Sequence, residues 1–279
     1  MSRMTSAAAT PAVPTTTAPT TIAPWDIGLF GTRTSGGKPY VVAVVGAASG
    51  IGRAAARFLA EIGCTVAALD PALDGLKSLA AEKPEIRIYN LDALNGRSIN
   101  ESFAAVVHDL GAIDALVNCA GITGKTNIPA HEVPLEDFDR VLALNLRAAM
   151  MLSQAVLPGM LKRGYGRLLH VASIAGKEGN AGMASYSTSK AGLIGLVKSM
   201  GKDYAESGVT VNALAPAVIR TPLVEALPQA TVDYMTAKIP MRRCGELAEA
   251  AACIAWIVSP ACGFTTGFTF DLSGGRATY

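Results

Sequence analysis

The stretch "VVAVVGAASGIG" at residues 41–52 decides the expected fold, because a short apolar run leads directly into a glycine-rich turn. Gly46, Gly50 and Gly52 let the backbone turn tightly and approach a bound pyrophosphate. The apolar periodicity of residues 51–62 indicates a following helix, whose free N–H groups and positive dipole end favour a phosphate. This order predicts a dinucleotide-binding unit, although glycine-rich strand-to-helix turns also occur for packing alone.

The pattern of this first unit repeats along the chain from Tyr40 onward, with short apolar runs alternating with longer helical ones. The expected strands are 41–45, 65–69, 86–90, 115–118, 167–172, 210–214 and 268–272, and the expected helices include 51–62, 98–110, 138–161, 186–206 and 246–258. The strands are continuous apolar runs, as burial on both faces of a parallel sheet requires. We predict an α/β fold: a single Rossmann-like, doubly wound parallel sheet of about seven strands with helices on both faces.

Residues 39–279 are expected to form one dinucleotide-binding domain, since no linker or composition break divides them. Residues 1–38 are expected to be a disordered tail, because their Thr-, Ala- and Pro-rich beginning cannot bury enough surface to order itself. A processed targeting peptide is the alternative, but the first 24 residues have a single basic residue, Arg3, and no apolar signal core. Residues 215–240 contain four prolines and follow a strand end, which predicts a substrate lid.

Composition narrows the class of partner. The 279-residue chain is 50% hydrophobic and 16% charged with a formal charge of +2, so it predicts a large core and neither a nucleic-acid groove nor a membrane-binding surface. No uninterrupted apolar stretch reaches the roughly 18 residues of a membrane span. The five cysteines are scattered without C-x-x-C spacing, which favours reduced thiols and a cytoplasmic location. We expect a small-molecule partner.

A carboxylate ends the second expected strand, "TVAALD" at residues 65–70. Asp70 lies near the spacing from Gly46 at which dinucleotide sites place the acid that binds the adenosine ribose hydroxyls. A carboxylate there repels a 2′-phosphate, so Asp70 favours NAD over NADP. The alternative is that Asp70 only caps a helix beginning at Pro71.

A tyrosine and a lysine stand four residues apart in "ASYSTSKA" at residues 184–191, so Tyr186 and Lys190 share one face of the expected helix. A free tyrosine has a pKa of about 10, too high for a general base near neutrality. An ammonium one helical turn away stabilises the phenolate and is expected to lower that pKa. The alternative is an exposed amphipathic pair without a catalytic role.

From Tyr40 onward the sequence resembles the short-chain dehydrogenase/reductase family. The resemblance rests on "GAASGIG" (46–52), "NLDA" (90–93), "NCAG" (118–121), "ASYSTSKA" (184–191) and "APAVIRTP" (215–222). The sequence departs from the family pattern at Val45, where threonine is usual, at Cys119, in place of a second asparagine, and at Ala217, in place of glycine.

The resemblance implies an enzyme, an NAD-dependent oxidoreductase that transfers hydride between a secondary alcohol and nicotinamide. The implied catalytic residues are Asn145, Ser173, Tyr186 and Lys190. Tyr186 would exchange the alcohol proton, Lys190 would also hold the nicotinamide ribose, Ser173 would hold the substrate oxygen, and Asn145 would fix a water leading to solvent. The implied cofactor contacts are Gly46, Ser49, Gly50, Ile51, Gly52, Asp70, Leu91, Asp92, Asn118, Ala120, Gly121, Tyr186, Lys190, Pro216, Ile219 and Thr221. Taken singly, Ser173 could be a turn cap and Asn145 an ordinary helix residue.

The segments "SIAGKEGNAG" (173–182) and "FDLSGGRATY" (270–279) resemble bacterial dehydrogenases of 2-keto-3-deoxy sugar acids, of the deoxyrhamnonate and deoxyfuconate type. We therefore expect an acidic substrate, a role in sugar acid catabolism, and substrate contacts from Ser173, Lys177, Arg147, Arg220 and Arg276. The resemblance also implies a homotetramer, in which Arg276 or Tyr279 would either reach a neighbouring site or strap an interface.

Two alternatives remain open at this point. A 3-oxoacyl carrier-protein reductase would use NADPH and a basic docking surface, and the sequence shows no basic cluster. An NAD-binding redox sensor with little turnover would not need Asn145, Ser173, Tyr186 and Lys190 together. No metal is expected, because the three histidines, His108, His131 and His170, are scattered and lack carboxylates at ligand spacing.

Overall fold

The computed structural model describes residues 39–279, and the predicted tail over residues 1–38 lies outside the described residues. A single seven-stranded sheet runs through the described part in the order β3-β2-β1-β4-β5-β6-β7. Every strand pair is parallel. The strands are β1 (Val41–Val45), β2 (Thr65–Asp70), β3 (Arg87–Asn90), β4 (Ala115–Asn118), β5 (Gly166–Val171), β6 (Val209–Pro216) and β7 (Thr269–Leu272). The predicted fold class is confirmed, and strand order reverses between β1 and β4, where α/β sheets form their ligand crevice.

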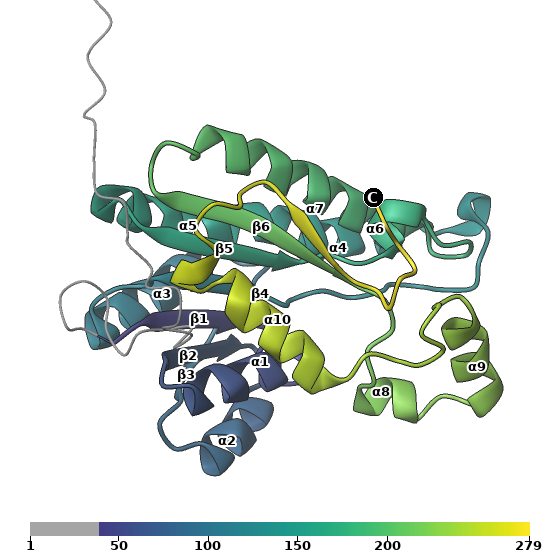
Figure 1. Ribbon diagram of the computed structural model, residues 1–279, viewed down its shortest axis with the longest axis horizontal. Coiled ribbons are helices and arrows are strands. Elements are labelled where there is room, and N and C mark those ends of the chain that lie inside the picture. Colours follow the sequence, from purple (N-terminus) through teal and green to yellow (C-terminus); the bar gives the residue numbers. More distant parts are fainter. Residues whose placement is uncertain (1–38) are drawn as a thin grey trace, which may run out of the picture.

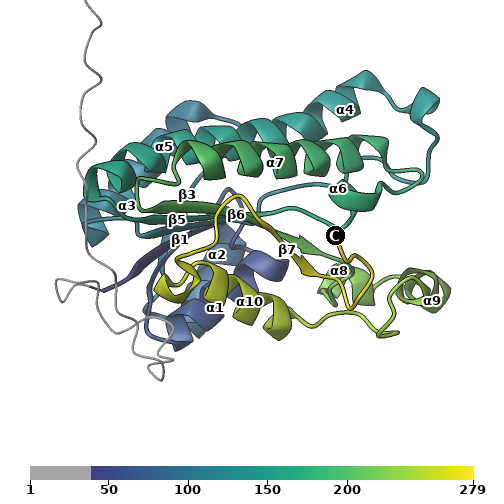
Figure 2. The same cartoon turned by 45° about the horizontal axis from the view of Figure 1, so that its top comes forward.

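Helices cover both faces of the sheet (Figures 1 and 2). One face is covered by α1 (Gly50–Glu61), α2 (Leu73–Glu82) and α10 (Leu247–Ile257). The other is covered by α3 (Gly96–Leu110), α5 (Ala148–Arg163) and α7 (Ala184–Asp203), with α4 (Leu135–Leu142) leading into α5. Short helices α6 (Ala175–Glu178), α8 (Pro222–Glu225) and α9 (Gln229–Ala237) lie at the end of the sheet that also holds the C-terminal segment.

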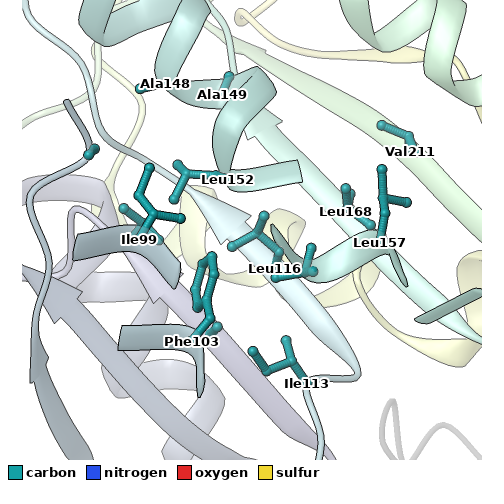
Figure 3. Close-up of a cluster of buried hydrophobic side chains, with 14 of the residues drawn as sticks. Ile99, Phe103, Ile113, Leu116, Ala148, Ala149, Leu152, Leu157, Leu168 and Val211 are labelled. Atoms are coloured by element: carbon teal, nitrogen blue, oxygen red, sulfur yellow. The ribbon is translucent and has the colours of Figure 1, made fainter. Parts of the chain in front are cut away.

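Two apolar cores form because alternate strand residues point to opposite faces. Val42 and Val44 pack under α1 and α10, whereas Ala43 and Val45 pack under α3, α5 and α7. Figure 3 shows the second of these cores, in which Phe103 of α3 lies beside Leu116 of β4. All five residues of β1 are buried, which explains its continuous apolar sequence.

The helix expected at 138–161 extends over residues 135–163, and its helical pitch changes in the middle. Helix α4 continues through a π-helical turn, η2 (Ala143–Arg147), into α5. The whole run, Leu135–Arg163, is long and apolar enough to cross a membrane by length and composition alone. Its apolar face nevertheless packs on the sheet, where Leu152, Leu157 and Met160 are buried.

Candidate active site

The turn after β1 is shaped by its three glycines. Gly46 and Gly50 have positive φ angles of 81° and 53°, which favour glycine. A Cβ on Gly46 would lie 2.9 Å from the amide nitrogen of Ala120, so this position needs glycine for packing as well. A Cβ on Gly50 would meet only the Thr221 Cγ2 atom, at 3.9 Å. The turn therefore packs tightly against residues 119 and 120, which follow β4, but is open at Gly50 and the start of α1, which fits a bound pyrophosphate.

Asp70 is half-buried at the end of β2 and holds two turns together. Its carboxylate accepts hydrogen bonds from the amides of Ala48 (3.2 Å) and Ala72 (2.9 Å). The first bond ties Asp70 to the glycine turn, and the second fixes the entry to α2. Helix α2 begins at Leu73 and not at Pro71, so Asp70 fixes the turn before the helix instead of capping it. This structural role leaves room for the ribose hydroxyls, because a carboxylate can accept about four hydrogen bonds.

The turn after β4 connects the glycine turn to the expected catalytic residues. The Asn118 Oδ1 atom accepts the amide of Ala120 at 3.1 Å, which shapes residues 118–121. At Gly121 an added Cβ would lie 3.1 Å from the Asn145 Oδ1 atom and 3.3 Å from the Lys190 Nζ atom. Gly121 therefore allows the backbone to approach both side chains. Leu91 is buried after β3, and the neighbouring Asp92 is exposed.

A cavity of about 230 Å³ brings many of the predicted site residues together at the carboxyl ends of the strands. It is lined by the predicted residues Ile51, Gly121, Ser173, Tyr186, Lys190, Pro216, Ile219 and Thr221. The other predicted cofactor contacts lie at the carboxyl ends of β1, β2, β3 and β4 or at the start of α1, and they do not line this cavity. Cys119, Ile122, Thr123, Val171, Ala172 and Ala217 also line it.

Burial sets the protonation chemistry of the tyrosine and lysine pair. Burial raises the pKa of Tyr186, and a hydrogen bond with Ser173 acts in the opposite direction. Burial lowers the pKa of Lys190 to about 8. The Lys190 ammonium donates to the Val171 carbonyl oxygen at 2.7 Å and lies 5.7 Å from the centre of the Tyr186 ring. The net direction is opposite to the expected lowering, because desolvation is the largest cause of the shift and Lys190 is not among its causes.

Asn145 lies in the π-helical turn η2 and is completely buried. Its Oδ1 atom accepts the Ile122 amide at 2.8 Å, and its Nδ2 atom donates to the Ile122 carbonyl (2.8 Å) and to the Ser189 Oγ atom (2.9 Å). Both amide hydrogens are therefore used within the protein, and only the second lone pair of Oδ1 remains for a water. Asn145 ties the loop after β4 to helix α7, next to Lys190. Such π turns often occur at functional sites.

Comparison with known proteins agrees with this geometry. A family model described as enoyl-(acyl carrier protein) reductase matches residues 46–277. A 2-dehydro-3-deoxy-L-rhamnonate dehydrogenase (NAD(+)) of Sphingomonas sp. (strain SKA58) is 44% identical, covering 85% of this chain and 94% of that protein. The chain belongs to the short-chain dehydrogenase/reductase family.

Two further proteins are similar to this chain over most of its length. A 3-oxoacyl-[acyl-carrier-protein] reductase of Thermotoga maritima is 36% identical, covering 84% of this chain and 96% of that protein. The crystal structure of gox2181 superposes with a TM-score of 0.81 at 28% identity, covering 86% of this chain and 96% of that one. The protein is therefore an oxidoreductase that uses a nicotinamide cofactor.

The basic residues predicted to receive a substrate carboxylate are mostly paired within this short-chain dehydrogenase. Lys177, with a 9% exposed side chain, binds Asp271 of β7 at 2.8 Å. Arg276, 10% exposed, binds Glu178 at 2.8 Å and the Asn180 Oδ1 atom at 3.1 Å. These contacts hold the C-terminal segment against the loop after β5 in the same chain.

The two remaining basic residues differ from each other. Arg220 is partly exposed and binds Glu246 at 3.1 Å. Arg147 is exposed at the end of η2, and within residues 39–279 it forms no ion pair. Arg147 is thus the cation among the four that is available to a ligand without breaking an internal pair.

Two features of the site could not be found by sequence reasoning. The Val171 carbonyl receives the Lys190 ammonium, but a backbone acceptor leaves no side-chain trace in the sequence. Ser173 accepts the amide of Ala175 at 3.1 Å, so it also has the turn-capping role considered as its alternative.

Within the described residues no group of His, Cys, Asp or Glu side chains could hold a metal ion.

Proposed function

We propose that the protein oxidises the secondary alcohol of a 2-keto-3-deoxy sugar acid with NAD as the hydride acceptor. The observation that supports this most directly is the 44% identity to a 2-dehydro-3-deoxy-L-rhamnonate dehydrogenase (NAD(+)) over nearly all of that relative. The 3-oxoacyl-[acyl-carrier-protein] reductases of Thermotoga maritima and Vibrio cholerae are each 36% identical. These values favour the sugar acid over the acyl thioester.

The surroundings of Asp70 support NAD as the cofactor. Its carboxylate at the end of β2 repels a 2′-phosphate and can accept the ribose hydroxyls. Arg53, the basic residue of α1 nearest the glycine turn, donates to the Gly75 carbonyl and to Glu82, both at α2. Its guanidinium is therefore already paired with an acid of its own chain.

The four expected catalytic residues would act as one unit. When bound, the nicotinamide supplies the hydride acceptor. As the phenolate, which Lys190 and the positive charge of the oxidised nicotinamide would favour, Tyr186 would take the proton of the substrate hydroxyl, and Ser173, its hydrogen-bond partner, would hold the substrate oxygen beside it. Lys190 donates to the Val171 carbonyl and offers its other hydrogens to the nicotinamide ribose and the phenolate. Asn145 keeps the loop after β4 and helix α7 in place around Lys190.

For the substrate carboxylate we propose Arg147, because Lys177, Arg220 and Arg276 already bind carboxylates of their own chain. We further propose a cytoplasmic homotetramer that acts on a free small molecule, without a nucleic acid or a membrane. The five free cysteines support a reducing compartment. Exposed apolar side chains on α4 and α5, among them Leu135 and Met150, support an interface between subunits.

The proposed function is tested by measuring NAD reduction with a panel of 2-keto-3-deoxy acids, aldonic acids, polyols and 3-hydroxyacyl thioesters. We expect turnover with a 2-keto-3-deoxy acid and NAD, and at least about tenfold lower kcat/KM with the other classes. Activity confined to NADPH and 3-oxoacyl thioesters would replace this function by carrier-protein reduction. Tight NAD binding without turnover on any member of the panel would favour a redox sensor.

The Asp70→Asn variant is expected to lower the ratio of kcat/KM with NAD to kcat/KM with NADP by about 10- to 100-fold, since a charged hydrogen-bond acceptor is lost and the repulsion of a 2′-phosphate disappears. Steady-state kinetics with both cofactors measure this ratio. Asp74→Asn is the matched control. Asp74 lies four residues further on, in the first turn of α2, and its side chain carries the same charge and is 99% exposed. An unchanged ratio in Asp70→Asn would leave Asp70 with its structural role alone.

A further inference from the structure

A buried histidine lies between the turn after β4 (residues 118–121) and helix α5, and it has no role in the proposed hydride transfer. His170 on β5 has no exposed surface and is paired in register with Asn118 on β4. Its Nδ1 atom lies 3.1 Å from the Asn118 Nδ2 atom, and its Nε2 atom lies 3.0 Å from the Ser153 Oγ atom. Both ring nitrogens therefore have a partner inside the protein.

The neighbours of His170 assign its tautomer. The Asn118 Oδ1 atom accepts the Ala120 amide, so its Nδ2 atom faces His170 and donates to Nδ1. The Ser153 hydroxyl donates to the Ala149 carbonyl at 2.8 Å, so its oxygen accepts the hydrogen on Nε2. The result is a chain of donors that runs in one direction from Asn118 to Ala149, which requires the neutral ring protonated on Nε2.

Two effects keep this ring neutral. Burial, followed by the positive charge of Lys190, lowers the pKa of His170 to about 4. Protonation would also place a hydrogen on Nδ1 and remove the acceptor for Asn118. The acceptor is thus present near neutral pH.

We propose that His170 is a positioning residue for the cofactor site, acting through the side-chain amide of Asn118. Asn118 is 2% exposed, so without an acceptor its Nδ2 group would be left unsatisfied in the core or the amide would turn over. Turning over breaks the bond from Oδ1 to the Ala120 amide, and an unsatisfied Nδ2 group loosens the side chain that accepts that amide. That bond shapes the turn which packs on Gly46 and brings Gly121 to Lys190.

This proposal rests on the proposed function in one respect, that the turn at residues 118–121 contacts NAD. Measuring the affinity for NAD, without turnover, therefore tests the role of His170. Asparagine at position 170 places its oxygen near the position of Nδ1 and keeps the acceptor for Asn118. Glutamine instead reaches toward Ser153, and leucine keeps the volume but neither polar atom. We expect His170→Asn to hold the Kd for NAD within about twofold of the wild type, and His170→Gln and His170→Leu to raise it by about tenfold or more.

Calorimetric titration with NAD measures the Kd of the wild type and of the three variants, and thermal unfolding reports the stability of each variant. Equal weakening in all three variants, or a wild-type Kd in a folded His170→Leu, would overturn the proposal. A wild-type protein that does not bind NAD would overturn the proposed function and this proposal with it. Nitrogen NMR of the wild type gives an independent check: a ring protonated on Nε2 supports the proposal, and one protonated on Nδ1 overturns it.

Discussion

Replacing Tyr186 by phenylalanine is expected to lower kcat by about 1,000-fold, the typical effect of losing a well-placed general acid or base. The substitution removes one hydroxyl, the group that forms a hydrogen bond with Ser173 in the cavity. The aromatic ring remains, and so does the wall that it forms against Lys190. The Kd for NAD is therefore expected to stay within about threefold of the wild-type value.

The matched control is Tyr165→Phe, which removes the same hydroxyl from a tyrosine outside the cavity. The Tyr165 hydroxyl forms a hydrogen bond with the Tyr40 hydroxyl at 3.0 Å, and both residues directly precede strands, so they lie at the amino ends of the strands, opposite the cavity. This control should lose about 1 kcal/mol of stability and keep its turnover. Initial rates and NAD titrations on both variants measure the two effects. A Tyr186→Phe enzyme that keeps a tenth of the wild-type kcat would remove Tyr186 from the mechanism.

The Gly52→Ala variant is expected to lower kcat/KM for NAD by about 100-fold, since small displacements of positioning groups have effects of that size. An added Cβ at this position would overlap the carbonyl oxygen of Gly46 and lie 2.8 Å from its carbonyl carbon. Backbone atoms cannot rotate away as a side chain would, so the turn that faces the pyrophosphate must move. Overpacking of this kind also costs about 1–3 kcal/mol of stability, or roughly 5 °C in Tm.

Gly96→Ala is the matched control for that variant. Gly96 lies in the first turn of α3, as Gly52 lies in the first turn of α1, but a Cβ on Gly96 would meet nothing within 4 Å. The control should keep the wild-type kcat/KM and gain slightly in Tm, because alanine lowers the entropy of the unfolded chain. Steady-state kinetics and thermal unfolding compare the two variants. Equal behaviour of Gly52→Ala and Gly96→Ala would mean that the turn tolerates the displacement.

The fold could be predicted from the sequence because the patterns that mark its strands and turns each lie within a few consecutive residues. The apolar runs that form β1 to β7 mark strands that differ from their expected bounds by about two residues at most. β6 extends to Pro216, beyond its expected end, because the sheet edge continues through pairing of that residue with Leu272. The glycine spacing after β1 predicts the turn for the same local reason.

The finer features of the site depend on residues far apart in the chain. Asn145 binds Ile122, 23 residues away, and Ser189, 44 residues away, so its π turn cannot be seen in helical periodicity. Lys177 binds Asp271, 94 residues away, and Arg276 binds Glu178, 98 residues away. Pairs so far apart cannot be recognised in the sequence, so both residues were predicted to be free to bind a substrate. The pKa of Tyr186 was predicted from its neighbour four residues on, whereas the burial that dominates it comes from the assembled cavity.

The strand order has a consequence for how the protein is made on the ribosome. β1 pairs with β2 on one side and with β4 on the other, and β4 lies far along the chain. During synthesis, β1, β2 and β3 therefore emerge and can pair while the second edge of β1 is still uncovered. That edge consists of four valines and one alanine, which have no polar side chain to discourage contact with another nascent chain. The interval before β4 emerges is thus the stage of biosynthesis at which a chaperone would protect this chain most.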